Sequence, residues 1–299
     1  MEIHAAHIDE SSLLEMRSLL RQPGNELDIS DFNELIALKS IQANINIWRD
    51  RAGLLLAFAF VDDFNNLCFA LDEKVGSDTL ELAIVEWGEA CIRKRKQETD
   101  EPATLDASCS AENRRRLALL ERHGFHREIV RTLRYERSLQ IPIPRLALPE
   151  GFHIRTVHGE DQAGPLAALH RAAFGTEHMT LEYRLARMRA PNYDPSLDLF
   201  IETSNGEPVA FCNCSIAEEE NGRHGTKNGY TDPIGVDPRY QGMGFGKAIL
   251  TAGLDALHNR GMECAKLGTS SANIPMQRLA ETLSFWIVSE KIWFSKNVV

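Results

Sequence analysis

Apolar and polar positions follow the same succession of periods in both halves of the chain. Apolar residues alternate with polar ones, as in strands, then recur with the period of a helix, and alternate again before a long helical stretch. The pattern predicts a protein of mixed helices and strands. In the first half we expect a short strand around Ile3, helices at 13–20 and 31–39, strands at 46–49, 54–60 and 67–71, and a helix from Asp78 to about Lys96.

The second half is expected to repeat this order. Its predicted elements are a strand at 153–156, helices at 161–174 and 180–189, strands at 198–203, 208–216 and 228–236, and a helix at 244–259. That last helix has an apolar stripe through Leu250, Leu254 and Leu257, and Gly261 is the type of residue that follows a helix end.

The two halves also end alike. Asn113 stands twelve residues before Phe125, Asn273 stands twelve before Phe285, and a β-rich closing strand follows each. A shared order of elements with a shared spacing indicates duplication of one α/β unit.

A proline-rich stretch separates the halves. Residues 141–151 contain Pro142, Pro144 and Pro149, which exclude a helix and favour an extended connector. We therefore predict a first domain at 1–140, a linker at 141–151 and a second domain at 152–299.

The glycine-punctuated segment from Val236 to Lys247 is the strongest candidate for chemistry. Gly242, Gly244 and Gly246 remove side chains where an anion would approach the main chain, and a helix begins near Gly244. Such a helix start carries roughly half a positive charge, so the segment predicts a phosphate site.

Known phosphate loops differ in their spacing. A nucleotide-hydrolysing P-loop would need glycine and a hydroxyl residue at the positions of Gln241 and Ala248. A dinucleotide fingerprint would need its third glycine at Lys247, although Glu263 stands where a ribose-binding acid would. An NAD-linked oxidoreductase is a minor alternative, and a plain glycine-rich turn is another.

The Gln-x-x-Gly-x-Gly core, formed by Gln241, Gly244 and Gly246, resembles the acetyl-CoA pyrophosphate loop of the GNAT N-acetyltransferase superfamily. Four segments of the second half are similar to the tandem-domain, mycothiol synthase-like subgroup. They are 170–174 (His-Arg-Ala-Ala-Phe), 178–180 (His-Met-Thr), 193–195 (Tyr-Asp-Pro) and 232–235 (Asp-Pro-Ile-Gly).

This resemblance implies an α/β (α+β mixed-sheet) fold of two tandem GNAT-like domains. Each would have a mostly antiparallel central sheet with a parallel V-shaped splay, flanked by helices. The first copy looks degenerate, because its loop position at 72–78 holds one glycine and three acids, which repel a diphosphate.

The resemblance further implies an N-acetyltransferase that uses acetyl-CoA as co-substrate and needs no metal. Asp232 would take the proton of the acceptor amine, directly or through water, and Tyr193 is a candidate to line the acceptor site and act as a proton donor. The residues expected to bind acetyl-CoA are Ile234, Gly235, Val236, Gln241, Gly242, Met243, Gly244, Phe245, Gly246, Lys247 and Asn273. Asp232 as a turn residue and Asn273 as a helix cap are the structural alternatives.

One position departs from the family pattern. Relatives have tyrosine, the acid that protonates the leaving thiolate, where this chain has Ala280. Either another donor such as Tyr193, Tyr183 or Ser284 replaces it, or the thiolate leaves unaided, or the protein binds acetyl-CoA as a pseudoenzyme or sensor.

Composition narrows the partners. The formal charge of −10 disfavours nucleic acid and anionic membranes and favours a cationic small-molecule amine, and the basic run at 93–96 fits a solvated helix end. The six cysteines show no zinc spacing and are expected to be reduced. The longest apolar run is too short to span a bilayer, so we expect a cytoplasmic protein, with a homodimer compatible with the sequence.

Overall fold

The computed structural model describes residues 9–72, 74, 78–99 and 103–299, so the strand predicted around Ile3 lies outside the described part. The chain forms two compact units. Met1–Arg131 and Glu290–Val299 make up the first, and Thr132–Ser289 make up the second.

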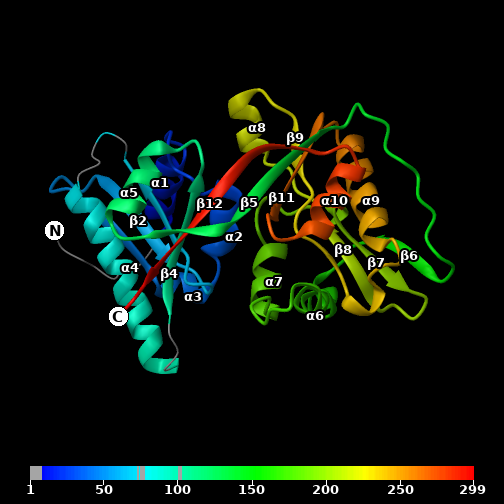
Figure 1. Ribbon diagram of the computed structural model, residues 1–299, viewed down its shortest axis with the longest axis horizontal. Helices are drawn as coiled ribbons and strands as arrows, with labels where there is room; N and C mark the ends of the chain where they lie inside the picture. Colours follow the sequence, from blue (N-terminus) through cyan, green and yellow to red (C-terminus); the bar gives the residue numbers. More distant parts are fainter. Residues whose placement is uncertain (1–8, 73, 75–77, 100–102) are drawn as a thin grey trace. The chain divides into compact units, whose positions relative to one another are not determined.

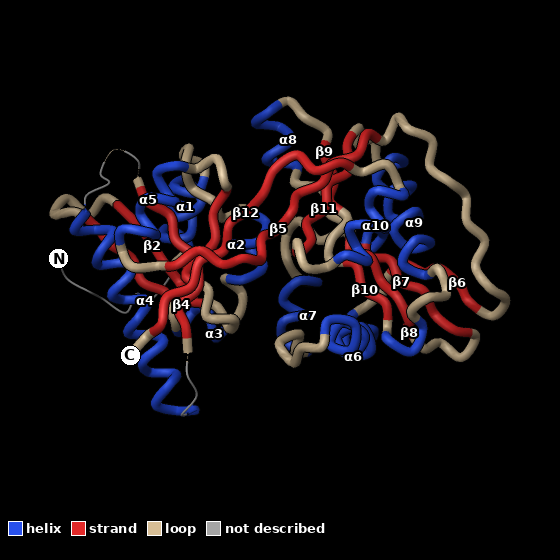
Figure 2. The backbone as a smooth tube through the Cα atoms, viewed as in Figure 1, coloured by secondary structure: helices blue, strands red, loops and turns tan. Residues whose placement is uncertain are grey.

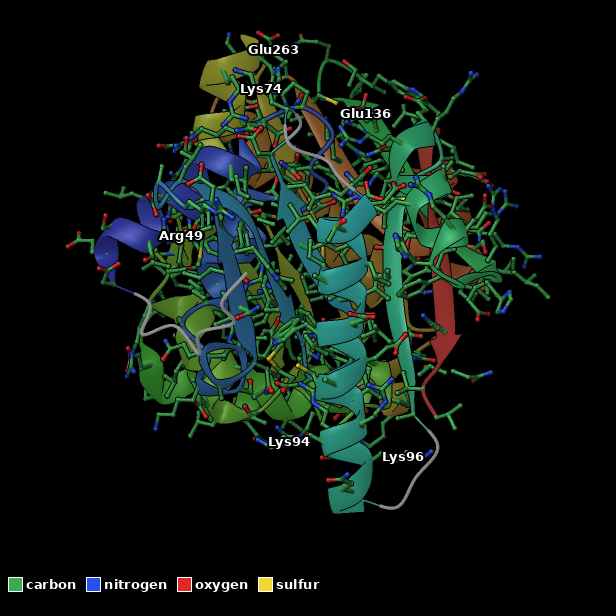
Figure 3. All side chains as sticks on the ribbon, turned by 90° about the vertical axis from the view of Figure 1, so that its left-hand side faces the viewer. Arg49, Lys74, Lys94, Lys96, Glu136 and Glu263 are labelled. Atoms are coloured by element: carbon green, nitrogen blue, oxygen red, sulfur yellow. The ribbon has the colours of Figure 1, made fainter. Side chains whose placement is uncertain are left out.

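The first unit is a layered α/β structure. Its elements are α1 (Glu10–Leu20), α2 (Ile29–Leu35), α3 (Lys39–Ala43), β1 (Ile45–Arg49), β2 (Leu55–Val61), β3 (Leu67–Leu71), α4 (Asp78–Thr99), β4 (Thr104–Ser110) and α5 (Arg114–Arg122). Strands β1, β2 and β3 form an antiparallel sheet, and α4 packs its buried Ile84 and Ile92 in the core with them. Figure 3 shows Lys94 and Lys96 on the last turns of α4, where the basic run was predicted to end a helix.

The helix predicted at 31–39 is divided. Leu38 has an extended backbone, with ψ of 134°, and α3 begins after it. Its buried side chain belongs to the core, so tertiary packing overrides the continuous helical pattern of the sequence.

The second unit repeats the plan. Its elements are β6 (Phe152–Thr156), α6 (Ala163–Phe174), α7 (Leu181–Met188), β7 (Asp198–Thr203), β8 (Pro208–Asn213), α8 (Glu218–His224), β9 (Asn228–Tyr230), β10 (Ile234–Val236), α9 (Phe245–Asn259), β11 (Cys264–Ser270) and α10 (Ile274–Thr282). Strands β10, β8, β7 and β6 are hydrogen-bonded neighbours in that order, each antiparallel to the next (Figure 2).

Helices cover both faces of that sheet. One core cluster joins Leu250 and Leu254 of α9 and Ala280 of α10 to residues of β7 and β8, and another joins Leu166 of α6 to Phe211 of β8 (Figure 1). The mixed α/β architecture flanked by helices is therefore as the resemblance implied.

Two segments of the second unit differ from the predicted pattern. The strand predicted at 208–216 ends at Asn213, and α8 follows with Glu218, Glu219 and Glu220 in its first turn and Gly225 after its end. Those acids and that glycine are signals for a helix that the alternation of apolar residues obscured.

The closing strands decide which residues complete each unit. Strand β5 (His126–Ser138) pairs through Thr132–Ser138 with β11 in the second unit, and β12 (Trp286–Asn297) pairs through Lys291–Asn297 with β4 in the first. The units therefore differ from the predicted ranges 1–140 and 152–299. Residues 141–149 contain no helix or strand.

Candidate functional site

The strand predicted at 228–236 is two strands that belong to different ladders. Strand β9 pairs in parallel with β11, and the N–H of Thr231 donates to the carbonyl of Lys266 at 2.9 Å. Strand β10 then pairs with β8 alone among the described strands. The sheet therefore opens between β10 and β11 directly after Thr231.

The edge of β10 that faces away from β8 has free main-chain groups. Asn213 donates to the carbonyl of Pro233 at 3.1 Å, and the N–H of Asp237 donates to Val209 at 2.9 Å. Because main-chain groups alternate along a strand, the N–H groups of Ile234 and Val236 point to the opposite edge. They have no acceptor among the described residues, so an extended polar chain can add there as a further strand.

The middle residue of β10 has a different role. A Cβ atom on Gly235 would lie 2.5 Å from the ring of Phe211 and 2.8 Å from Cβ of Ala173. Glycine here lets α6 approach the sheet, and Gly235 main-chain groups pair with Phe211 of β8.

The loop after β10 leads directly into α9. Gly242 and Gly244 have φ of 77° and 84°, values that favour glycine, and Gly244 precedes the first residue of α9. The main-chain N–H groups of residues 242 to 247 donate to no acceptor within the described part of the chain. They form a concentrated set of donors at the positive end of a helix, which suits a phosphate.

Side chains in the predicted loop do not all face a ligand. Phe245 is 1% exposed and contacts Phe152 with ring centroids 4.7 Å apart, so only its N–H is available. Gln241 donates through Nε2 to the carbonyl of Val236 at 3.3 Å, whereas Met243 is exposed. Lys247 has no described ion-pair partner and lies in the first turn of α9.

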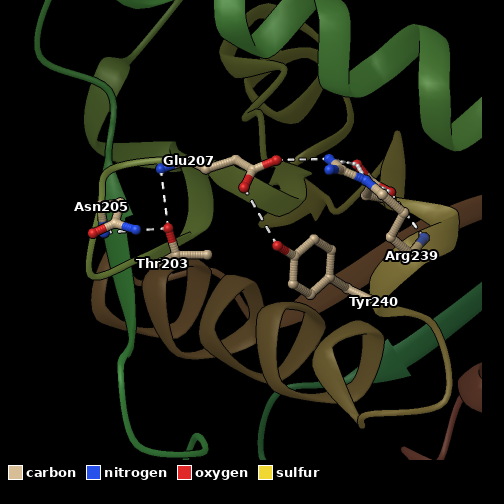
Figure 4. A network of polar contacts seen from close by, with 6 residues as sticks. Thr203, Asn205, Glu207, Arg239 and Tyr240 are labelled. Carbon is tan, nitrogen blue, oxygen red and sulfur yellow. Dashed lines mark hydrogen bonds and ion pairs between the residues drawn. The ribbon is translucent and has the colours of Figure 1, made fainter.

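A polar network holds the loop in place, as Figure 4 shows. Arg239 contacts Glu207 at 2.6 Å and Asp237 at 2.7 Å, and the hydroxyl of Tyr240 donates to Glu207 at 3.3 Å. The guanidinium charge of Arg239 is thereby neutralised by carboxylates. Arg239 anchors the loop to the turn between β7 and β8.

Asp232 lies between β9, which pairs with β11, and β10, which pairs with β8. Its Oδ2 accepts a hydrogen bond from the N–H of Gly268 at 3.0 Å. Burial raises the pKa of this carboxyl above its usual range, while the Gly268 bond and the charges of Arg187 and Arg134 oppose the rise. A carboxylate with a raised pKa at the opening of the sheet has the properties of a general base, and it also satisfies a backbone donor.

Asn273 and Asn113 occupy equivalent positions. Each caps a nine-residue helix, Asn273 by accepting from Met276 and Asn113 by accepting from Arg116. The Asn113 amide also donates to Glu26 at 2.7 Å and to the carbonyl of Gly24 at 3.1 Å. The Asn273 amide donates to no described residue, so it remains available to a ligand.

The first unit fills the corresponding edge with its own chain. Leu71, like Val236, precedes an aspartate whose N–H pairs with the neighbouring strand. The side chain of Asn25 accepts from the N–H of Leu71 at 2.9 Å and donates to its carbonyl at 3.1 Å. Arg116 is buried against Phe69, and that burial lowers its pKa to about 10.

The predicted aromatic candidate Tyr193 is engaged in a buried network. Its hydroxyl donates to Asp198 at 2.7 Å, and Asp198 also pairs with Arg184 at 2.5 Å and accepts from Asn213. Burial and the Asp198 charge raise the pKa of Tyr193. The contact is that of a loop anchor, and a catalytic role for Tyr193 stays a prediction.

Sequence reasoning missed Tyr135 of β5. Its side chain is 1% exposed, its hydroxyl has no hydrogen-bond partner among the described residues, and it shares a core cluster with Ala280. Burial raises its pKa. The sequence shows only an alternating strand at this position, so nothing marked Tyr135 as special.

His170 of α6 is neutral and enclosed by aromatic rings. It stacks on Phe174 and Phe211 with centroids 4.6 Å and 5.4 Å apart, and burial lowers its pKa to about 4. A histidine with so low a pKa stays uncharged at neutral pH, which fits a packing role.

The described residues contain neither a metal-ligand cluster nor a membrane-spanning helix. No three histidine, cysteine, aspartate or glutamate side chains there gather as they would around a metal ion. No described helix combines the length and apolar character needed to cross a membrane.

Part of the second unit is similar to a known family of proteins. Residues 165–285 match the acetyltransferase (GNAT) family. The mycothiol acetyltransferase of Thermobispora bispora is 35% identical over 173 residues, which cover 55% of this chain and 58% of that protein. The mycothiol acetyltransferase of Acidothermus cellulolyticus is 32% identical, with coverage of 56% and 54%. The chain thus spans about half the length of the curated relatives it matches.

Solved structures share the fold over almost the whole chain. A GCN5-related N-acetyltransferase from Sphaerobacter thermophilus has a TM-score of 0.66 at 20% identity, covering 96% of this chain and 90% of its own. A tandem GNAT protein of the clavulanic acid biosynthesis pathway has a TM-score of 0.69 at 13% identity, covering 100% and 99%. The chain therefore has the mixed α/β GNAT fold, and the match to the acetyltransferase (GNAT) family lies within its second half.

Proposed function

We propose that the second unit transfers an acetyl group from acetyl-CoA to an amine of a small molecule. The observation that carries this proposal is the run of unpaired N–H groups at residues 242 to 247, next to the free edge of β10. The loop would hold the diphosphate, and the N–H groups of Ile234 and Val236 would pair with the amide-containing arm. The Asn273 amide would donate to the same arm.

Asp232 would act as the base. The amine nitrogen forms a bond to the acetyl carbon, the carbon–sulfur bond breaks, and one amine proton passes to the Asp232 carboxylate or to a water that it orients. The raised pKa suits this task because a carboxylate of ordinary pKa is a weaker proton acceptor near neutral pH.

A proton donor would assist departure of the thiolate, and Ala280 cannot supply the proton. Tyr135 is our first choice of donor, because its buried hydroxyl is unpartnered on the side of the sheet where Ala280 lies. Burial raises the pKa of Tyr135, so the hydroxyl is protonated at neutral pH. Tyr193, whose hydroxyl already donates to Asp198, is the second choice.

Calorimetric titration with acetyl-CoA tests the binding site. Gly244→Glu places a carboxylate among the N–H donors and should weaken binding at least tenfold. Gly261→Glu is the matched control, since Gly261 has φ of 76°, has open space around it and follows the other end of α9. Equal affinities in the two variants, or no binding to the unaltered protein at hundreds of micromolar, would reject the proposal.

The second candidate is an acetyl-CoA-binding pseudoenzyme or sensor, which the loss of the family tyrosine at Ala280 favours. A screen of amine acceptors for release of free CoA separates the two functions. Turnover that falls in Asp232→Asn supports the enzyme, and a further fall in Tyr135→Phe supports Tyr135 as donor. Binding without release in any condition supports the pseudoenzyme.

A cytoplasmic location and a homodimer stay predictions from the sequence. Size-exclusion chromatography with light scattering measures the mass in solution and so tests the homodimer directly.

A further inference from the structure

Three residues of the second unit lie at one level: Asp232 just after β9, Gly268 on β11 and Arg134 on β5. In the parallel register of β9 and β11, Tyr230 pairs with Lys266, so Asp232 falls level with Gly268, whose N–H it accepts at 3.0 Å. In the antiparallel register of β11 and β5, Gly268 pairs directly with Arg134. Gly268 therefore stands between Asp232 and Arg134.

The Asp232 carboxylate and Arg134 lie on the same face of the sheet. Leu133 and Tyr135 are buried in the core cluster that contains α9 and α10, so alternation along the strand puts Arg134 on the opposite face, with Thr132. A Cβ atom on Gly268 would lie 3.4 Å from Oδ2 of Asp232 and 3.6 Å from Cγ2 of Thr132. Both contacts place the carboxylate beside that face.

Because Gly268 has no side chain, nothing from β11 separates the carboxylate from the arginine at this level. Adjacent strands are about 4.8 Å apart, so the main chains at Asp232 and Arg134 are roughly 10 Å apart. A small molecule with one polar group at each end spans a separation of this order.

Arg134 is an exposed cation without a described ion-pair partner. Its neighbour on the same face, Lys266, differs because it pairs with Glu136 at 3.2 Å. A second cation, Arg187 of α7, also acts electrostatically on Asp232. Both cations act on the Asp232 carboxylate, although the whole chain has a formal charge of −10.

We propose that the acceptor carries an anionic group, a carboxylate or a phosphate, which Arg134 binds while the amine faces Asp232. This inference rests on the proposed acetyl transfer and replaces the cationic acceptor that net charge favoured. A guanidinium suits this role because its planar set of donors matches two oxygens of either anion.

The test uses amines in matched charged and neutral pairs, with CoA release as the readout. Glycine, β-alanine and γ-aminobutyrate are compared with their amides, and glucosamine 6-phosphate is compared with glucosamine. We expect the preferred anionic member to exceed its neutral partner at least tenfold in kcat/KM, mainly through KM. The chain-length series reports the separation of amine and anion, and the sugar pair distinguishes phosphate from carboxylate.

Arg134→Gln should remove that preference, and Arg134→Lys should restore part of it. Lys266→Gln is the control, because it deletes a cation of the same face that Glu136 already neutralises. The inference is overturned if the charged and the neutral amine of each pair release CoA at equal rates, or if neither releases any. It is also overturned if the preference for the anionic amine survives in Arg134→Gln. CoA release from charged and neutral amines alike overturns only this inference, whereas no acetyl-CoA binding, or binding without release from any amine, also counts against the proposed function.

Discussion

Asp232 combines a structural contact with a candidate catalytic one. Its carboxylate satisfies the N–H of Gly268 where two strands diverge, and an unsatisfied buried donor there would cost about 1–3 kcal/mol. The same position brings an acceptor of protons to the opening of the sheet. A substitution must therefore keep the hydrogen bond from Gly268 in order to test the proposed role of Asp232 as a base.

Asp232→Asn meets that requirement, because an amide oxygen can still accept from Gly268. We expect kcat/KM to fall about 100-fold or more, with little change in affinity for acetyl-CoA. The unaltered enzyme should lose activity as pH falls through a pKa above the ordinary aspartate value of 3.8, since protonation removes the base. Rates and titrations measured from pH 5 to 9 check both points. A variant with full activity would leave Asp232 only its structural role.

Ser284 has a backbone conformation that favours glycine. Its φ is 64°, and Gly124, at the equivalent position of the first copy, has φ of 82°. A left-handed conformation costs an L-residue about 1–2 kcal/mol, and glycine avoids this cost. Glycine loses more backbone entropy on folding, however, and this loss cancels roughly half of the gain. Ser284→Gly should therefore raise the free energy of unfolding by about 0.5–1 kcal/mol, measured by urea denaturation. Gly124→Ser is the reciprocal control and should lower it, and a destabilised Ser284→Gly would contradict this account.

At the scale of elements, the two units differ in what pairs with the free edge of one strand. This strand is β10 in the second unit and β3 in the first. In the second unit β10 ends in free N–H groups, whereas in the first unit Asn25 occupies both main-chain groups of Leu71. Glu26 likewise occupies the Asn113 amide. The first copy is therefore closed by its own segment, in addition to having an acidic loop sequence.

This difference predicts one acetyl-CoA site per chain. Calorimetry should give a stoichiometry of about 1, and Gly244→Glu should abolish the whole signal rather than half of it. Asn25→Ala should lower stability by about 1–3 kcal/mol, because it leaves the Leu71 N–H unsatisfied, without adding a second site. A stoichiometry of 2 would show that the first unit also binds the cofactor.

At the scale of the whole molecule, each unit contains a segment from the other half of the sequence. Glu290–Val299 belongs to the first unit, and Thr132–Gln140 belongs to the second. The paired strands contribute buried residues, Phe294 in one case and Tyr135 in the other. Neither half of the sequence is complete without the other.

Cleavage of the linker tests this arrangement. A protease site introduced at 144–147, where the side chains are exposed, would be cut in the folded protein. We expect the two fragments to co-elute on size exclusion and to keep the thermal transition of the uncut protein, because each unit still has its closing strand. Fragments that separate without denaturant would show that the exchanged strands contribute little.

The sequence by itself determined most elements, the repeated plan and the glycine-rich loop before α9. Strands β3 and β7 have their predicted limits, because alternation and flanking turn residues are local signals. Glycines with positive φ before a helix are equally local, so Gly242 and Gly244 were recognisable without coordinates.

Only the tertiary structure decided which strand completes each unit, where the sheet opens, and which side chains meet there. The break after Thr231, the unpartnered hydroxyl of Tyr135 and the alignment of Arg134 with Asp232 depend on pairing between strands far apart in the sequence. Local patterns contain no information on such pairing, because register and partner are fixed by packing across the sheet.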